Sequence, residues 1–248
     1  MEQFILKKLD MELNGEDYLE FVKAIMLRAK ITKRVGDTVY FSYQLDTNAE
    51  NKIEFIAEGE LKNSEVFLKE FFIHHTANDI WNITLEKVKN KIYVIKKGDF
   101  ETLVTLVNEK ELKEGLQNVE VSAFGHSLNI FKTEEDYLED VKKCGAVKIE
   151  NGAILPLVYL NRKLDKQDVE ELDRLVTLRG QIIKLKEESI NVFGIDAGRY
   201  IIATVRTCFG DLPVYFKLNS IETKNLESIK EGDTLVGNVS ITCKVKGE

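Results

Sequence analysis

Residues 71–81 read FFIHHTANDIW and hold two of the three histidines, an Asn–Asp pair and the only tryptophan of the 248-residue chain. The stretch is either a catalytic or metal-binding site or the end of an ordinary helix. Neighbouring side chains point about 100° apart on a helix and to opposite faces of a strand. His74 and His75 are therefore poorly placed to bind one metal ion together, which favours the structural interpretation.

The residues before this stretch indicate a helix. Phe67, Phe71 and Phe72 recur at three-and-four spacing behind Asn63, whose side chain can accept a hydrogen bond from a free backbone N–H. His75 continues that apolar face, where an imidazole can bind the last helical carbonyls. The Thr-Ala-Asn-Asp that follows is typical of an exit turn. We expect a helix that begins at residue 63 and ends near His75.

The same signals recur along the first 178 residues. Side chains that can cap a helix precede apolar residues at three-and-four spacing in five places. These predicted helix starts are Asn14, Asn63, Asp99, Thr133 and the pair Asp165 and Asp168. Gly145 and Gly180 stand where left-handed helix ends favour glycine. Between the helices, alternating apolar and polar residues predict strands. The predicted strands are 38–45, 52–61, 81–88, 91–96, 119–124, 127–132, 146–150 and 153–160.

Short turns join these strands into hairpins. Asn151–Gly152 favours a two-residue hairpin turn, and Gly125–His126 fits a turn with glycine first. Pro156 cannot donate a hydrogen bond to a sheet, so its strand is expected at an edge.

The predicted pattern of helix followed by hairpin therefore repeats. Residues 16–23 (EDYLEFVK) match residues 135–142 (EDYLEDVK) at every position but one. Repeated units of this kind usually arise by duplication. The alternative is chance, because amphipathic helix starts use few kinds of residue.

Residues 179–248 differ from the preceding part in their pattern of apolar and polar residues. Alternation is nearly continuous, with one short helical stretch at residues 221–229. A turn at Gly210–Asp211 would pair residue 205 with 216 and residue 203 with 218, which places their apolar sets on one face. About five short strands with a helix before the last resemble a barrel of the OB type in architecture, without any family motif. The sequence thus predicts an α+β fold: repeated helix–β-hairpin units over residues 1–178, then a small antiparallel OB-like β-barrel over residues 179–248.

One face of the predicted barrel combines basic and aromatic side chains. Alternation places six of them outside the core: Lys184, Lys186, Tyr200, Arg206, Tyr215 and Lys217. Arg206 and Tyr215 are expected directly opposite each other. Such a face can bind single-stranded nucleic acid, since rings stack on bases and cations follow phosphates, or it can bind an oligosaccharide. The competing interpretation is a solvated face stabilised by one cross-strand pair.

The remaining candidates for chemistry are few. A hydrolase could use His75, Asp79 and His126, provided that these groups converge in one pocket. The sequence otherwise predicts no catalytic residue, metal site or cofactor. Three widely spaced cysteines, Cys144, Cys208 and Cys243, form no CxxC pair, and no signal-peptide pattern opens the chain. A cytoplasmic protein with reduced thiols is expected.

The charge distribution gives the preferred function. The net charge is −7, and residues 1–144 carry 20 basic and 27 acidic side chains, whereas residues 145–248 carry 15 of each. An acidic surface favours a basic partner and disfavours phosphate. We therefore expect a non-enzymatic cytoplasmic binding protein that contacts another protein through its acidic N-terminal part, where the charge favours a basic partner. Nucleic-acid binding by the barrel and hydrolysis remain the alternatives, and no membrane contact is expected.

Overall fold

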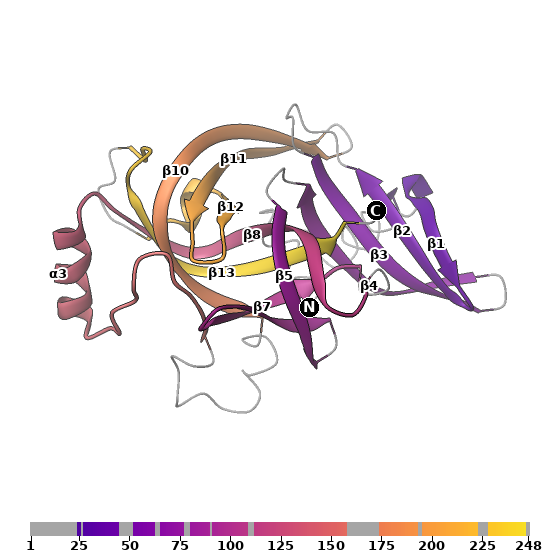
Figure 1. Ribbon diagram of the computed structural model, residues 1–248. Helices are drawn as coiled ribbons and strands as arrows, with labels where there is room; N and C mark the ends of the chain where they lie inside the picture. Colours follow the sequence, from indigo (N-terminus) through magenta and orange to yellow (C-terminus); the bar gives the residue numbers. More distant parts are fainter. Residues whose placement is uncertain are drawn as a thin grey trace. The chain divides into compact units, whose positions relative to one another are not determined.

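A computed structural model gives the structure of this chain. It describes residues 24–25, 27–44, 52–62, 65–76, 80–89, 91–108, 112–157, 174–192, 195–222 and 228–246. The chain divides into two compact units (Figure 1). Unit 1 comprises Met1–Thr76 with Glu188–Arg199, and unit 2 comprises Ala77–Glu187 with Tyr200–Glu248.

Unit 1 contains a four-stranded antiparallel sheet in chain order. Its strands are β1 (Lys30–Val35), β2 (Thr38–Gln44), β3 (Lys52–Lys62) and β4 (Glu65–Thr76). Val39 and Phe41 of β2 and Phe55 and Ala57 of β3 are buried. Because they occupy alternate positions on paired strands, they form the apolar face of this sheet.

A nine-stranded mixed sheet forms the framework of unit 2. Its strands are β5 (Ile80–Lys89), β6 (Ile92–Lys97), β7 (Phe100–Leu106), β8 (Leu116–Phe131), β9 (Ile154–Pro156), β10 (Leu175–Val192), β11 (Ile195–Arg206), β12 (Asp211–Phe216) and β13 (Thr234–Val245). The parts of strands β10 and β11 within Glu188–Arg199 belong to unit 1. The helix α3 (Glu134–Cys144) and the 3-10 turn η2 (Leu218–Ser220) complete the described elements of unit 2. The strand order is β11-β12-β8-β5-β6-β7-β13-β10-β9, with further pairings of β11 with β10 and of β8 with β13.

These further pairings close the sheet into two rings that share β8 and β13. One ring runs β8-β5-β6-β7-β13, and the other runs β8-β13-β10-β11-β12. Each ring contains one parallel pair, β7 with β13 in the first and β12 with β8 in the second. A single cluster of buried apolar side chains extends through both rings, so the two rings share a core as well as two strands.

The shared strands β8 and β13 approach each other closely at glycine. Gly237 of β13 lies opposite Leu128 of β8, and a Cβ atom on it would be 2.2 Å from the carbonyl oxygen of Ser127. At the same place the pairing skips His126, because Asn238 pairs with Ser127 while Val239 pairs with Gly125. An extra residue of this kind is a β-bulge, which bends a strand and increases its twist. The bulge lies in β8, which pairs with β5 in one ring and with β12 in the other.

The predicted fold class is therefore wrong, since strands dominate the described residues and repeated helix–hairpin units are absent from them. The stretch behind Asn63 is strand β4, which pairs with β3, and the stretch behind Asp99 is strand β7, which pairs with β6. The helix behind Thr133 is confirmed, as α3. Of the helix predicted behind Asn14, residues 24–25 and 27–28 are described and are helical, and its start lies outside the described residues. The helix predicted at Asp165 and Asp168 and residues 16–23 of the proposed duplication also lie outside them.

Several predicted turns are also different. Gly125–His126 is the bulge within β8 and joins the two strands that were predicted separately. Gly180 is a position of β10 where a Cβ atom would be 2.5 Å from the carbonyl oxygen of Arg206, so it permits close strand approach and does not end a helix. Residues 146–150 are not a strand, although Asn151–Gly152 is a turn. Pro156 is at a sheet edge as predicted, because β9 ends the strand order.

The C-terminal strands do not form a barrel of their own. β12 and β13 pair with β8, and β13 also pairs with β7, so the strands after residue 179 complete rings begun by residues 80–131. The register of β11 with β12 also differs from the prediction: Val205 pairs with Leu212, and Ala203 pairs with Val214. The turn lies earlier in the chain than predicted, over residues 207–210, where Thr207 and Gly210 exchange backbone hydrogen bonds.

Candidate functional site

The best-defined polar surface of unit 2 is the helix α3, whose ends are fixed by local signals. The Thr133 side chain accepts from the backbone N–H of Asp136, and the Asp136 carboxylate accepts from the backbone N–H of Thr133, which forms a capping box. Gly145 adopts a left-handed conformation with φ of 63° and ends the helix. Acidic residues in the first turn and Lys142 and Lys143 in the last turn complement the helix dipole.

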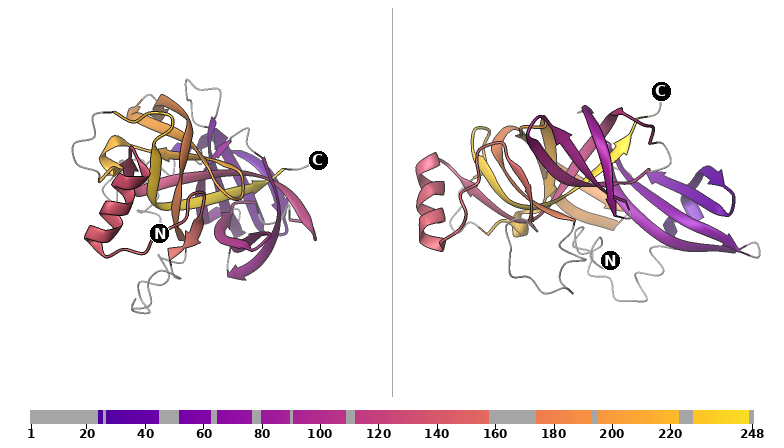
Figure 2. Two further views of the ribbon diagram at one scale, coloured as in Figure 1. Left: turned by 60° about the vertical axis from the view of Figure 1, so that its left-hand side comes forward. Right: turned by 60° about the horizontal axis from the view of Figure 1, so that its bottom comes forward.

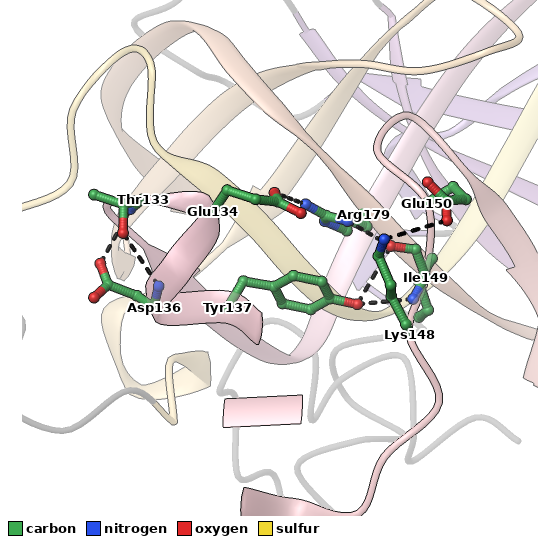
Figure 3. Close-up of polar contacts among 8 residues, drawn as sticks. All are labelled: Thr133, Glu134, Asp136, Tyr137, Lys148, Ile149, Glu150 and Arg179. Atoms are coloured by element: carbon green, nitrogen blue, oxygen red, sulfur yellow. Dashed lines mark hydrogen bonds and ion pairs between the residues drawn. The ribbon is translucent and has the colours of Figure 1, made fainter. Parts of the chain in front are cut away.

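A single buried side chain attaches α3 to the sheet. Tyr137 is the one residue of α3 that is buried, and its ring packs edge-on against Phe131 of β8 at a centroid distance of 5.5 Å. Its hydroxyl accepts from the backbone N–H of Ile149 at 2.7 Å and donates to the Ile149 carbonyl at 3.3 Å (Figure 3). In all three views α3 lies at the margin of unit 2, which agrees with this small contact (Figures 1 and 2).

Arg179 of β10 completes the attachment. Its guanidinium carbon lies 3.9 Å from the centroid of the Tyr137 ring, a cation–π contact worth roughly 2 kcal/mol when desolvated. One terminal nitrogen donates to the Ile149 carbonyl at 2.6 Å, and the other forms a salt bridge with Glu134. The Arg179 side chain is 2% exposed and that of Glu134 is 49% exposed. A buried charge needs such a partner, so Glu134 holds the first turn of α3 against the sheet.

This attachment leaves the other acidic side chains of α3 on the surface. Glu135, Asp136 and Glu139 are exposed, and Asp140 is half-buried. Glu134 is engaged by Arg179, Asp136 by the capping box and Asp140 by the Cys144 thiol. Glu135 and Glu139 are therefore the carboxylates of α3 without a side-chain contact among the described residues. Four residues apart on a helix, they face the same way. They can bind cationic side chains of a partner.

Sequence reasoning did not identify Arg179 or its contacts. Arg179 stands beside Gly180, which the sequence assigns to a helix end, and Glu134 directly follows the predicted helix start at Thr133. Alternation along β10 places Arg179 on the face opposite Leu178. Nothing local in the sequence shows that a distant helix covers that face.

Of the six residues predicted on a nucleic-acid-binding face, two are buried. Tyr200 is 1% exposed and Tyr215 is 2% exposed, so the prediction that they lie outside the core is wrong. Tyr215 pairs with Ile202 and packs against Phe124, and it is not opposite Arg206. Arg206 is exposed and instead pairs with Asp211, with a salt bridge of 3.5 Å.

The other cations of that face lie on β10 and directly after β12. Lys184 is exposed and Lys186 is half-buried on β10, while the ammonium group of Lys217 lies 5.0 Å from the Tyr200 ring centroid. Lys217 and Tyr200 therefore form a cation–π pair, in which the buried Tyr200 ring is not exposed for stacking on a base. Nucleic-acid or oligosaccharide binding stays a prediction.

The proposed hydrolase residues are described only in part. His75 belongs to β4 in unit 1, and Asp79 lies outside the described residues. His126 is half-buried at the bulge of β8 in unit 2, where its Nε2 is 3.2 Å from the Ser240 hydroxyl. The neighbouring His74 is buried on β4. Within the described ranges, no three or more His, Cys, Asp and Glu side chains form a cluster that could hold a metal ion.

The three cysteines are free and differ in their environment. Cys144 is exposed on α3, Cys208 is half-buried at the β11–β12 loop, and Cys243 is buried in β13. Burial raises the pKa of the Cys208 thiol, and it raises the pKa of Cys243 far above the ordinary range, which keeps that thiol neutral. Neither Cys208 nor Cys243 is therefore an activated nucleophile.

Comparisons with known proteins add no homologue. No family model matches the chain, and no curated protein or solved structure gives a significant match to it. Within the part of the chain that the structure describes, no helix is long and apolar enough to cross a membrane.

Proposed function

We propose that the chain is a non-enzymatic cytoplasmic binding protein that contacts a basic protein through the acidic surface of its first 144 residues. α3 is the described element that presents such a surface. The observation that supports this most is the exposure of Glu135 and Glu139 on a helix fixed by a capping box, an αL glycine and the Tyr137–Arg179 contact.

The geometry favours recognition over catalysis. A helix that is fixed at both ends pays little conformational entropy when a partner binds. Carboxylates on such a helix attract a basic surface from a distance and accelerate association, particularly at low ionic strength. Free thiols at Cys144, Cys208 and Cys243 are consistent with a reducing compartment.

Affinity capture from native cell extract tests this function. The bait is the full chain, compared with the double variant Glu135→Lys/Glu139→Lys. The matched control is Asp99→Lys/Glu114→Lys, which makes the same change in net charge at two exposed positions of unit 2 outside α3. Captured proteins and nucleic acids are identified and released with increasing salt.

The proposal predicts a basic protein as the main species captured by the wild-type chain and by the control, and its loss with the α3 variant. Equal capture by both variants would exclude α3 as the binding element. Recovery of RNA or DNA as the main species would instead support the alternative prediction of nucleic-acid binding.

A further inference from the structure

The end strand of the four-stranded sheet has an edge of distinctive chemistry. β1 is the terminal strand of that sheet, and β2 is its partner among the described strands. In an antiparallel pair, every second residue directs its backbone N–H and C=O away from the neighbouring strand. β1 therefore carries a row of backbone donors and acceptors along its outer side, which is the template for an additional strand.

Charge distinguishes this edge from the rest of the chain. β1 reads KITKRV and contains three basic and no acidic residues, in a chain of net charge −7. Lys30 and Arg34 are both exposed, and the Arg34 side chain is held by a 3.2 Å hydrogen bond to the Gly36 carbonyl. The edge therefore presents positive charge.

Two exposed apolar side chains lie next to these cations along β1. Ile31 is 65% exposed and Val35 is 47% exposed. Ile31 lies opposite Phe41, whose side chain belongs to the buried face of the sheet. Ile31 is thus the uncovered rim of an apolar face, and a further strand beside β1 would extend that face over it.

We propose that the β1 edge binds an extended, acidic segment of another protein as an additional strand. Backbone hydrogen bonds supply the affinity. Because of the bulge at Thr32, Lys30 lies opposite Ser42 on one face of the sheet and Arg34 lies opposite Val39 on the other, so acidic side chains on either face of the segment meet a cation of β1. A second copy of β1 is disfavoured because pairing would bring like charges together. The cations of β1 therefore disfavour self-association and attract an acidic partner. This surface is separate from α3 and takes a partner of opposite charge.

A peptide-binding experiment on the full chain tests the proposal. The probe is a fluorescent heptapeptide that alternates glutamate with valine or isoleucine. One control peptide replaces each glutamate with lysine, and another carries N-methyl groups on alternate backbone nitrogens. The protein variants are Lys30→Glu/Arg34→Glu and, as a matched change in charge on α3, Lys142→Glu/Lys143→Glu.

The expected result is that the acidic peptide binds, that salt weakens it, and that neither control peptide binds. Lys30→Glu/Arg34→Glu should weaken binding at least tenfold, while Lys142→Glu/Lys143→Glu should not change it. The proposal is overturned if the acidic peptide does not bind, if the N-methylated peptide binds equally, if both protein variants weaken binding alike, or if a single-stranded oligonucleotide displaces the peptide.

Discussion

Strand β4 and helix α3 carry the same apolar spacing and yet adopt different structures. The three-and-four pattern behind Asn63 predicts a helix as clearly as the one behind Thr133, but the first is a strand of twelve residues and the second is a helix of eleven. Apolar spacing alone therefore does not decide between them.

Two differences account for the outcome. α3 has a complete capping box, acidic residues in its first turn, basic residues in its last turn and Gly145 behind it. β4 reads EVFLKEFFIHHT, is rich in aromatic and β-branched residues, and pairs with β3 from Glu65 to Thr76. Signals within α3 determine it locally, whereas a partner strand determines β4. The same difference, between local signals and pairing with distant strands, separates α3 from the strands of both sheets, which are called the framework below.

The largest loss of stability is expected from a substitution at Gly237, where β13 and β8 pair although they are far apart in the sequence. Gly237→Ala should lower the free energy of unfolding by at least about 3 kcal/mol, because its Cβ would meet backbone atoms of β8 that cannot move independently. Denaturant unfolding of the variant measures this. The control Gly98→Ala, with φ of 60° and no atom within 4 Å of the new Cβ, should cost about 1 kcal/mol. Equal costs would contradict the close approach of β8 and β13.

The attachment of α3 should have an intermediate effect. Glu134→Gln removes the counter-ion of the buried Arg179 and should cost about 1.5 kcal/mol, less than a fully buried pair because Glu134 is half exposed. Glu135→Gln, one residue along the same helix, should change stability by less than about 0.5 kcal/mol. Chemical unfolding of both variants compares them, and similar values would remove the special role of Glu134.

The buried thiol of Cys243 should make the free energy of unfolding fall at alkaline pH by a similar amount. The pKa of Cys243 is raised by burial, so the unfolded chain loses this proton first and stability falls as pH rises above about 9. At pH 10 the loss should be about 1.4 kcal/mol. Cys243→Ala should reduce this slope between pH 8.5 and 10.5 and leave the contribution of the half-buried Cys208, and Cys144→Ala on α3 should preserve it. A slope that is unchanged in Cys243→Ala would refute the assignment.

The smallest effect should come from the local cap. Thr133→Ala should cost about 1 kcal/mol, since it removes the acceptor for the Asp136 N–H, whereas Thr133→Ser should restore most of it. Circular dichroism of a peptide spanning residues 132–146 should show the same order of helicity. A peptide spanning residues 63–77 should show no helix under the same conditions.

These contrasts also show what the sequence could predict. Alternation located β2, β3, β5 and β6, and the capping residues located α3. Tyr200 was misplaced because β11 is buried on both faces, as Ile202 and Ala203 show, so alternation there no longer separates inside from outside.

Long-range pairing explains the other errors. β8 was divided at Gly125 because a bulge and a turn use the same residues. The candidate site was only partly predictable, because Glu134 and Arg179 meet through the fold and not through sequence spacing.

Hydrogen exchange of the intact protein tests the contrast between α3 and the framework most directly. The amides of α3 should exchange through local opening, at least about 100-fold faster than those of β8 between Val119 and Phe124, and Glu134→Gln should accelerate exchange in α3 alone. Equal protection of both segments, or a uniform response to Glu134→Gln, would contradict the account of α3 as a locally determined helix fastened at Arg179.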